Sequence, residues 1–344
     1  MATALKRVAT ASRRRISSIT GCLAIAGLVL VAAVGLLRYY WLERDMGSGP
    51  AGAPVAGEPF QRVWSRRPVL LLGLGDSVTA GFGASPGKSY FQRLARNPSD
   101  ESAAVRGRSL IAVYPKLTAR NEAVSGSTSP QHLERILRLP VFSRDTQGLV
   151  VMTTGGNDVI HDYGRSAPKE AAMYGATLTQ SLPWIANFAA RLERMVRELR
   201  RRFPGGMHLF LANIYDPTDG DGTAGVVGLP AWPDGLRIHA AYNAAIERVA
   251  KRHPAVTLVD IRTPLLGHGI YCRQFWRGHY RAADPTYWYD PNFEDPNDRG
   301  YDAIRRAFLN AILSERSVSG NGAGKPIPAR GETAAAASPF GSNH

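Results

Sequence analysis

The sequence predicts an α/β protein: a three-layer α/β/α sandwich with a central parallel sheet, preceded by one transmembrane helix. Short runs that are apolar on both faces alternate with longer amphipathic stretches, which is typical of buried parallel strands joined by helices. A long uncharged run lies near the N-terminus. The chain is 44% hydrophobic and 20% charged, so it has enough apolar material for a folded core.

The N-terminal apolar run has the length of a membrane span. Residues 19–37 reach about 28 Å as a helix, close to the ~30 Å hydrocarbon core of a bilayer. Basic residues precede it, namely Lys6, Arg7, Arg13, Arg14 and Arg15. This bias predicts a cytoplasmic segment at residues 1–15, an uncleaved signal-anchor helix at 16–38 and an extracytoplasmic remainder, with the protein single-pass in the cell membrane. A cleaved signal peptide is the alternative, but its apolar core is shorter and does not run into Tyr39-Tyr40-Trp41.

Composition divides the rest of the chain into three parts. Residues 46–64 include a Gly/Ala/Pro-rich stretch and are expected to form a linker. Residues 65–315 carry the alternating pattern and are expected to form one domain. Residues 316–344 are rich in Gly, Ala and Ser and are predicted to be a disordered tail.

Strands and helices alternate along the predicted domain. The expected strands are residues 69–74, 148–153, 207–214 and 256–261, with a weaker one at 119–124. The expected helices are residues 89–96, 130–139, 182–203, 236–252 and 298–314. In parallel sheets of this kind, functional sites form at the carboxyl ends of the strands.

The charge and cysteine content exclude several classes of function. The net charge is +14, of which +5 lies in residues 1–45 and +2 in the tail. The remainder is diffuse and forms no basic cluster interleaved with aromatic residues, so no nucleic-acid partner is expected. Two cysteines, Cys22 and Cys272, exclude a disulfide framework and a Cys-only zinc site. No cofactor or metal is expected.

Three polar motifs follow predicted strands. Gly75-Asp76-Ser77 places a serine in a tight turn after the first strand. Gly126 follows the weak strand, and Gly155-Gly156-Asn157 follows the next one. Each motif alone is no more than a polar turn. Together they supply a nucleophile, Ser77, and an oxyanion hole with three donors: the Ser77 N–H, the Gly126 N–H and the Asn157 amide. One such donor is worth about 2.7–4 kcal/mol of the barrier.

With these motifs, the chain resembles the GDSL/SGNH hydrolase superfamily. The resemblance covers roughly residues 69–313, where the Gly-Asp-Ser, glycine and Gly-Gly-Asn-Asp blocks stand in the family's order. It implies a three-layer α/β/α hydrolase fold and serine esterase or lipase chemistry.

The last block departs from the family pattern Asp-x-x-His-Pro. Pro296 keeps the register, but Asp295 stands in the position of the histidine and Asn292 in that of the aspartate. A free Asp is a weaker base than His by about 2.6 pKa units. Either Asp295 is the base, or His279 or His268 from the preceding insertion is the base and Asp295 orients it. A degenerate site is the third reading.

The expected function is a membrane-anchored, extracytoplasmic ester hydrolase acting through an acyl-Ser77 intermediate. The expected substrates are acylated glycans or lipid esters. Two other functions stay open: a catalytically silent domain that binds a glycan or lipid, and an anchored acyltransferase.

Two insertions each have two interpretations. The aromatic-rich insertion around 268–289 is either a substrate wall or core beneath a loop. The acidic loop 216–232 is either a calcium loop or a polar turn.

Overall fold

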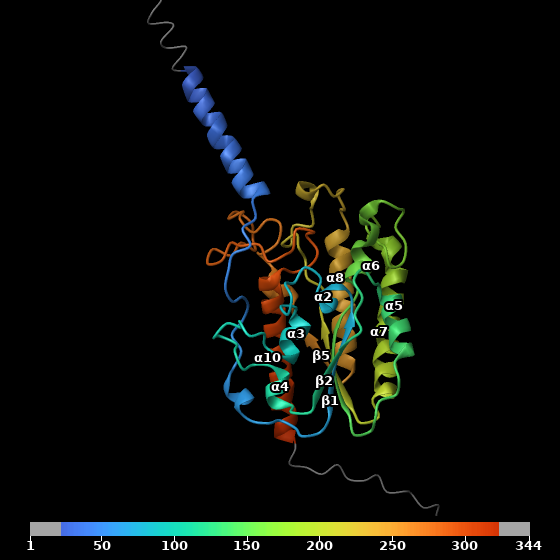
Figure 1. Ribbon diagram of the computed structural model, residues 1–344. Coiled ribbons are helices and arrows are strands. Elements are labelled where there is room, and N and C mark those ends of the chain that lie inside the picture. Colours follow the sequence, from blue (N-terminus) through green and yellow to red (C-terminus); the bar gives the residue numbers. More distant parts are fainter. Residues whose placement is uncertain (1–21, 323–344) are drawn as a thin grey trace, which may run out of the picture.

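The computed structural model describes residues 22–322. The predicted cytoplasmic segment 1–15, the first part of the predicted anchor and residues 323–344 of the predicted tail lie outside the described residues. Figure 1 shows an α/β domain with one helix standing off from it.

A five-stranded parallel sheet forms the centre of the domain, with the strand order β2-β1-β3-β4-β5. This is the flavodoxin-like order, and it confirms the predicted fold class. The strands are β1 Val69–Gly75, β2 Leu117–Asn121, β3 Gln147–Thr153, β4 Met207–Ala212 and β5 Val256–Val259.

The burial of the strands explains why their sequences differ. Every residue of β1 is buried, because the strand lies between two neighbours and under helices on both faces. Along it, Leu71 enters one core, whereas Leu70 and Leu72 enter the other. The edge strand β2 is exposed over most of its length, so it carries Thr118 and Arg120 and gave only a weak signal in the sequence.

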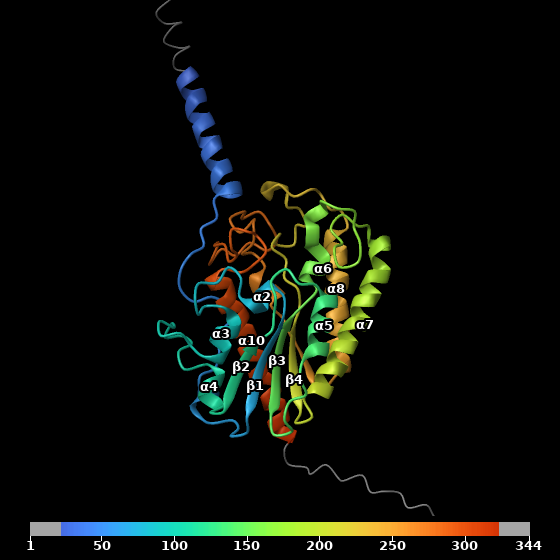
Figure 2. The same ribbon diagram turned by 45° about the vertical axis from the view of Figure 1, so that its right-hand side comes forward.

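Helices cover both faces of the sheet (Figures 1 and 2). On one face lie α5 Ser129–Arg138, α7 Leu178–Arg202 and α8 Gly235–Arg252, and on the other α3 Tyr90–Ala95, α4 Leu110–Val113 and α10 Asp298–Gly322. The short helices α2 Ser77–Ala80, α6 Gly156–Ile160 and α9 Arg262–Leu265 follow the carboxyl ends of β1, β3 and β5. The result is the predicted sandwich of three layers.

The N-terminal helix Cys22–Leu42 is long and apolar enough to cross a membrane, and it is the one such helix among the described residues. Its 18-residue window has a mean hydropathy of 2.2 and is not buried by the domain. The last turn, Arg38–Leu42, is π-helical.

The segments on both sides of residues 65–315 are connected to the domain by buried side chains or by helix. Ala51, Val55 and Phe60, in the predicted linker, are buried against the domain. The Ala51 N–H donates to the Asp302 carboxylate of α10 at 3.0 Å, which fixes this stretch to the helix. At the other end, α10 continues past the predicted boundary at residue 315 to Gly322.

Candidate active site

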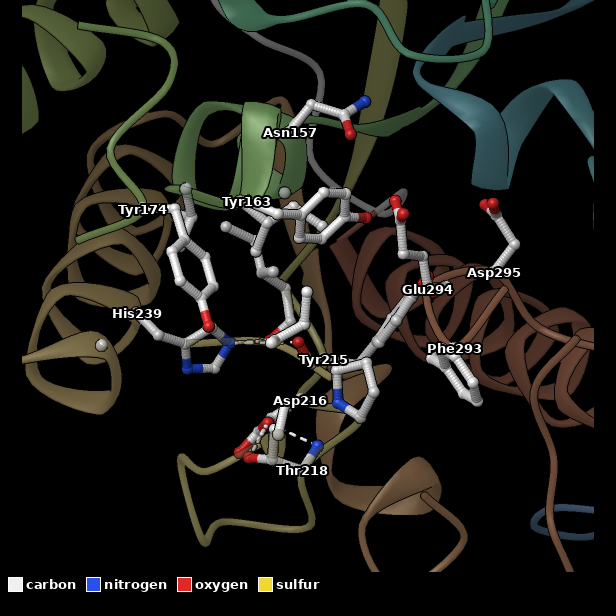
Figure 3. Close-up of a pocket in the computed structure, with 18 of the residues that line it drawn as sticks. Asn157, Tyr163, Tyr174, Tyr215, Asp216, Thr218, His239, Phe293, Glu294 and Asp295 are labelled. Atoms are coloured by element: carbon white, nitrogen blue, oxygen red, sulfur yellow. Dashed lines mark hydrogen bonds between the residues drawn. The ribbon is translucent and has the colours of Figure 1, made fainter. Parts of the chain in front are cut away.

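A cavity of about 400 Å³ opens at the carboxyl ends of the strands. Its walls come from α2, α6, the loop after β4 and the loop before α10, and they are mainly apolar. The apolar lining includes Val159, Ile160, Tyr163, Tyr174, Ile214, Tyr215, Val227, Leu229, Trp232, Leu236, Ile261, Ile270 and Phe293. The polar lining includes Ser77, Asn157, Glu294 and Asp295. Figure 3 shows Glu294 and Asp295 on the same side of the cavity.

Ser77 is placed at this cavity by the turn that joins β1 to α2. Gly75 has a φ of +120°, and a Cβ there would come within 1.9 Å of the Thr153 carbonyl oxygen, so only glycine fits. Asp76 caps the helix by accepting from the Val78 N–H at 3.2 Å. Ser77 is therefore the first residue of α2 and lines the cavity, half-buried.

Asp76 joins the ends of two central strands. Its Oδ1 also accepts from the Thr153 hydroxyl at 2.6 Å, which ties the turn after β1 to the end of β3. Burial, together with the charge of Asp295, raises the pKa of Asp76 to about 6, against the hydrogen bond from Thr153. The Asp76 side chain therefore holds the turn that carries Ser77 in place.

Asn157 lines the cavity and is tied to the loop that carries Gly126. The Asn157 Nδ2 donates to the Ser127 carbonyl at 3.0 Å, and because an amide has two N–H groups, this bond leaves one of them unused. Gly126 is exposed with a φ of +76° and is not among the residues that line the cavity. The Gly126 loop is thus attached to the site through Asn157.

A buried histidine that the sequence analysis missed supports this loop. The His132 Nε2 lies 2.8 Å from the Ser127 hydroxyl, and its Nδ1 lies 2.7 Å from the Thr154 hydroxyl. Ser127 itself donates to a backbone carbonyl, that of Val124 at 2.6 Å. Burial lowers the pKa of His132 to about 3, so the ring is neutral and links the second motif to the third.

Asp295 is buried at the edge of the cavity, where the last motif meets α2. The Asn292 Nδ2 donates to its Oδ2 at 2.7 Å. Its Oδ1 is buried and has no hydrogen-bond partner among the described residues. Burial raises the pKa of Asp295, while the Ser77 hydroxyl and Asn292 act in the opposite direction. The structure thus brings Ser77 and Asp295 together.

Glu294 adds a second carboxylate that the sequence analysis passed over. Figure 3 shows its side chain pointing the same way as that of Asp295, toward the level of Asn157. Burial, together with the charge of Asp295, raises the pKa of Glu294 to about 7. The preceding Phe293 has a φ of +68°, a strained conformation for a bulky residue. The adjacency of two acidic residues in the last motif is the sequence feature that could have identified Glu294.

Neither histidine of the insertion lines the cavity. His279 is exposed, and its ring lies against Gly220, so it does not reach the site in this structure. His268 stacks on Trp288 with 3.4 Å between ring centroids, and its Nδ1 donates to the Thr286 carbonyl at 3.0 Å. Burial lowers its pKa to about 4, so His268 is a neutral core residue.

Among the described residues, His239 is the histidine that lines the cavity. Its Nε2 donates to the Ile214 carbonyl at 3.0 Å and lies 3.2 Å from the Tyr215 carbonyl. A nitrogen that faces two carbonyls carries the proton and has no lone pair to act as a base. Figure 3 shows His239 across the cavity from Asp295.

The acidic loop and the aromatic insertion support each other. Asp219 accepts backbone N–H groups of the insertion, from Gly267 and Gly269 at 2.8 Å each. Asp216 accepts from the backbone of its own loop. Most aromatic residues of the insertion are buried, including Tyr271, Tyr287, Trp288 and Tyr289, and the insertion contributes Ile270 to the cavity.

The fold and the site define a class of protein: an α/β domain with a polar cluster and an apolar cavity at the carboxyl ends of a parallel sheet. The chain belongs to the GDSL-like lipase/acylhydrolase family, whose model matches residues 74–303. It is thus a hydrolase-family protein with an N-terminal apolar helix.

Several solved structures are similar to this chain. A lipolytic G-D-S-L family protein from Veillonella parvula shares 12% identity at a TM-score of 0.44, covering 71% of this chain and 98% of that one. The acetylxylan esterase Axe2 from Geobacillus stearothermophilus shares 20% identity at 0.44, covering 72% and 95%. The esterase EstA from a Pseudoalteromonas species shares 15% at 0.41, covering 71% and 97%. A comparison with curated proteins found no match.

Proposed function

We propose that the protein is a membrane-anchored, extracytoplasmic serine ester hydrolase in which Ser77 is the nucleophile and Asp295 is the base. One observation carries the proposal: Asp295 lines the same cavity as Ser77, and its Oδ1 is buried without a hydrogen-bond partner among the described residues. A buried oxygen in that state is a ready acceptor for the proton of a serine nucleophile.

In the first step, Ser77 Oγ attacks the ester carbonyl and its proton passes to Asp295 Oδ1. The second N–H of the Asn157 amide and the backbone N–H of Ser77, two residues that line the cavity, stabilise the oxyanion. Asp295 then gives the proton to the leaving alcohol, and the acyl-Ser77 ester remains. A water that loses a proton to Asp295 attacks this ester, and Asp295 returns that proton to Ser77 Oγ as the acid leaves.

The environment of Asp295 compensates for the missing histidine. Burial raises the pKa of the carboxyl, so its anion is a stronger base than an exposed aspartate. Asn292 donates to the other oxygen and fixes the orientation of the carboxylate. Asn292 therefore does for Asp295 what a carboxylate does for histidine in the family pattern, with the hydrogen-bond direction reversed.

The cavity favours an acyl group with a hydrocarbon chain. Its lining includes apolar side chains such as Leu229 and Trp232, which provide hydrophobic contact but few hydrogen-bond partners. The helix Cys22–Leu42 is long enough to hold the domain at a bilayer. Lipid esters therefore fit the site better than acylated glycans.

The test is hydrolysis of p-nitrophenyl esters by the purified full chain in detergent. Ser77→Ala is expected to abolish turnover and covalent labelling by a fluorophosphonate. Ser143→Ala, which changes an exposed serine at the other end of the sheet, is expected to leave both unchanged. Turnover that survives Ser77→Ala would falsify the mechanism.

Two other outcomes would favour the other functions. If the chain is not labelled but binds lipid or glycan measurably, it is a silent binding domain. If an added alcohol is converted to an ester, the reaction is acyl transfer.

A further inference from the structure

Four aromatic side chains gather where the N-terminal helix meets the domain, and we call Tyr39, Tyr40, Phe275 and Trp276 the aromatic patch. Tyr40 contacts Phe275 and Trp276, with ring centroids 5.8 and 5.0 Å apart. Phe275 is 60% exposed, Trp276 51% and Tyr39 46%. The patch thus joins two segments far apart in the sequence and presents its rings outward.

The contacts beneath the patch are specific and polar. The Gln274 side chain is buried and donates to the Tyr40 carbonyl at 3.2 Å. The Arg273 guanidinium lies over the Tyr39 ring, 4.6 Å from its centroid, and pairs with Glu43 at 3.5 Å. Phe275 and Trp276 are therefore held at the level of the end of the helix.

In a bilayer spanned by this helix, the end of the helix next to the domain would lie at the membrane–water interface. The helix is apolar up to Leu37, and the rings follow in the next turn. Tyr and Trp are favoured at the membrane–water boundary because each has an apolar ring and a polar group. Two adjacent large aromatic side chains exposed beside a membrane-length helix fit the same surface.

We propose that Phe275 and Trp276 insert into the lipid interface next to the N-terminal helix and form a second membrane contact. This contact fixes the domain with its cavity end toward the bilayer. Figures 1 and 2 show the helix leaving from the end of the sheet where α2 and α6 lie. Ile270 of the same insertion lines the cavity, so the insertion connects the lipid contact to the site. The proposal rests on the membrane location in the proposed function, and not on its chemistry.

Tryptophan fluorescence in reconstituted vesicles tests the contact without using activity. The full chain is placed in phosphatidylcholine/phosphatidylglycerol vesicles with or without brominated acyl chains, which quench only tryptophans in contact with lipid. The emission of Trp276 is the difference between the unmodified chain and Trp276→Phe, which removes the contribution of the other five tryptophans of the chain. We expect brominated lipid to reduce this difference at least twofold.

The matched control is Val141→Trp in the Trp276→Phe chain. Val141 is 64% exposed and precedes β3, at the amino end of the sheet, away from the proposed contact. Its emission should be quenched by aqueous acrylamide and not by brominated lipid. If Trp276 behaves in the same way as this control, the proposal is wrong.

A second variant tests the orientation. Phe275→Ser with Trp276→Ser removes the exposed rings and leaves the lining of the cavity intact. We expect hydrolysis of an ester embedded in the vesicles to fall severalfold, and hydrolysis of a short soluble ester to stay unchanged. If the double variant loses the same fraction of its activity on both esters, or none on the embedded ester, the orientation is overturned. If the unmodified chain hydrolyses neither ester while lipid still quenches Trp276, the enzymatic proposal fails and the membrane contact stands.

Discussion

Asn292 holds Asp295 from two sides: its Nδ2 donates to Oδ2 of Asp295 at 2.7 Å, and its Oδ1 accepts the Asp295 N–H at 3.0 Å. The two departures from the family motif therefore form one hydrogen-bonded unit. An aspartate at 292 would place a second negative charge against Asp295, whereas an amide is a neutral donor. Asn292 and Asp295 are chemically complementary, which argues that the two departures from the family motif are related.

Asp295→Asn should reduce kcat by about 10²–10⁴-fold with little change in KM, because the amide keeps the shape but cannot accept the Ser77 proton. Steady-state kinetics with a p-nitrophenyl ester measure this. Asp145→Asn, at an exposed carboxylate, is the matched control, and His279→Ala should have no effect. The assignment fails if Asp295→Asn keeps most of the activity and His279→Ala removes it.

Asn292→Asp should move the acidic limb of the pH–rate profile to higher pH by about one unit or more. The new carboxylate disfavours the ionised form of Asp295, so the base becomes available only at higher pH. The plateau rate should fall less than in Asp295→Asn. An unmoved limb would show that the titration of Asp295 does not limit the rate.

The double variant Asn292→Asp with Asp295→His restores the family pattern at the same positions. Its activity should follow the titration of an imidazole, with a midpoint near the ordinary histidine value of about 6.5. This is measured as the pH dependence of kcat/KM. A double variant that folds and is labelled by a fluorophosphonate, but does not follow this midpoint, would contradict the role given to position 295.

Glu294 should make stability decrease with rising pH. Its folded pKa of about 7 lies above the ordinary value, so the folded state binds the proton more tightly than the unfolded state. The stabilising contribution is complete below about pH 4.5 and is lost as pH rises through 7. Because the side chain is partly exposed, the effect is on the order of 1 kcal/mol.

Urea unfolding in detergent at pH 5 and pH 8 measures this effect. The unmodified chain should lose more free energy of unfolding between these pH values than Glu294→Gln. The buried Asp76, whose pKa is also raised, acts in the same direction in both proteins and cancels from the comparison. Equal losses in the two chains would remove Glu294 as the cause.

Chain length should control substrate preference. Each buried CH2 contributes about 0.8 kcal/mol, so p-nitrophenyl octanoate should exceed the acetate in kcat/KM by at least tenfold. Val227→Trp, which fills the apolar part of the cavity, should lower the rate on octanoate and spare the acetate. If both esters lose equally in this variant, the acyl chain does not bind there.

The sequence by itself determined the layered fold and the position of Ser77 after the first strand. A run such as β1 is apolar on both faces because helices cover both sides of it, and this requirement is visible in each residue. Ser77, Gly126 and Asn157 follow their strands directly, so their place at one end of the sheet followed from the parallel topology. These are properties of short stretches of chain.

Only the tertiary structure decided how the last motif, the insertion and the linker are placed. Local sequence leaves open which side chain meets Ser77, because the insertion and the last motif reach the site through long-range contacts. The structure places Asp295 there and leaves His279 on the surface. It also packs Ala51 against α10 and seats Tyr40 on the insertion, although nothing in the local composition marks these partners. The physical reason is that these placements depend on burial and hydrogen bonds between segments far apart in the sequence.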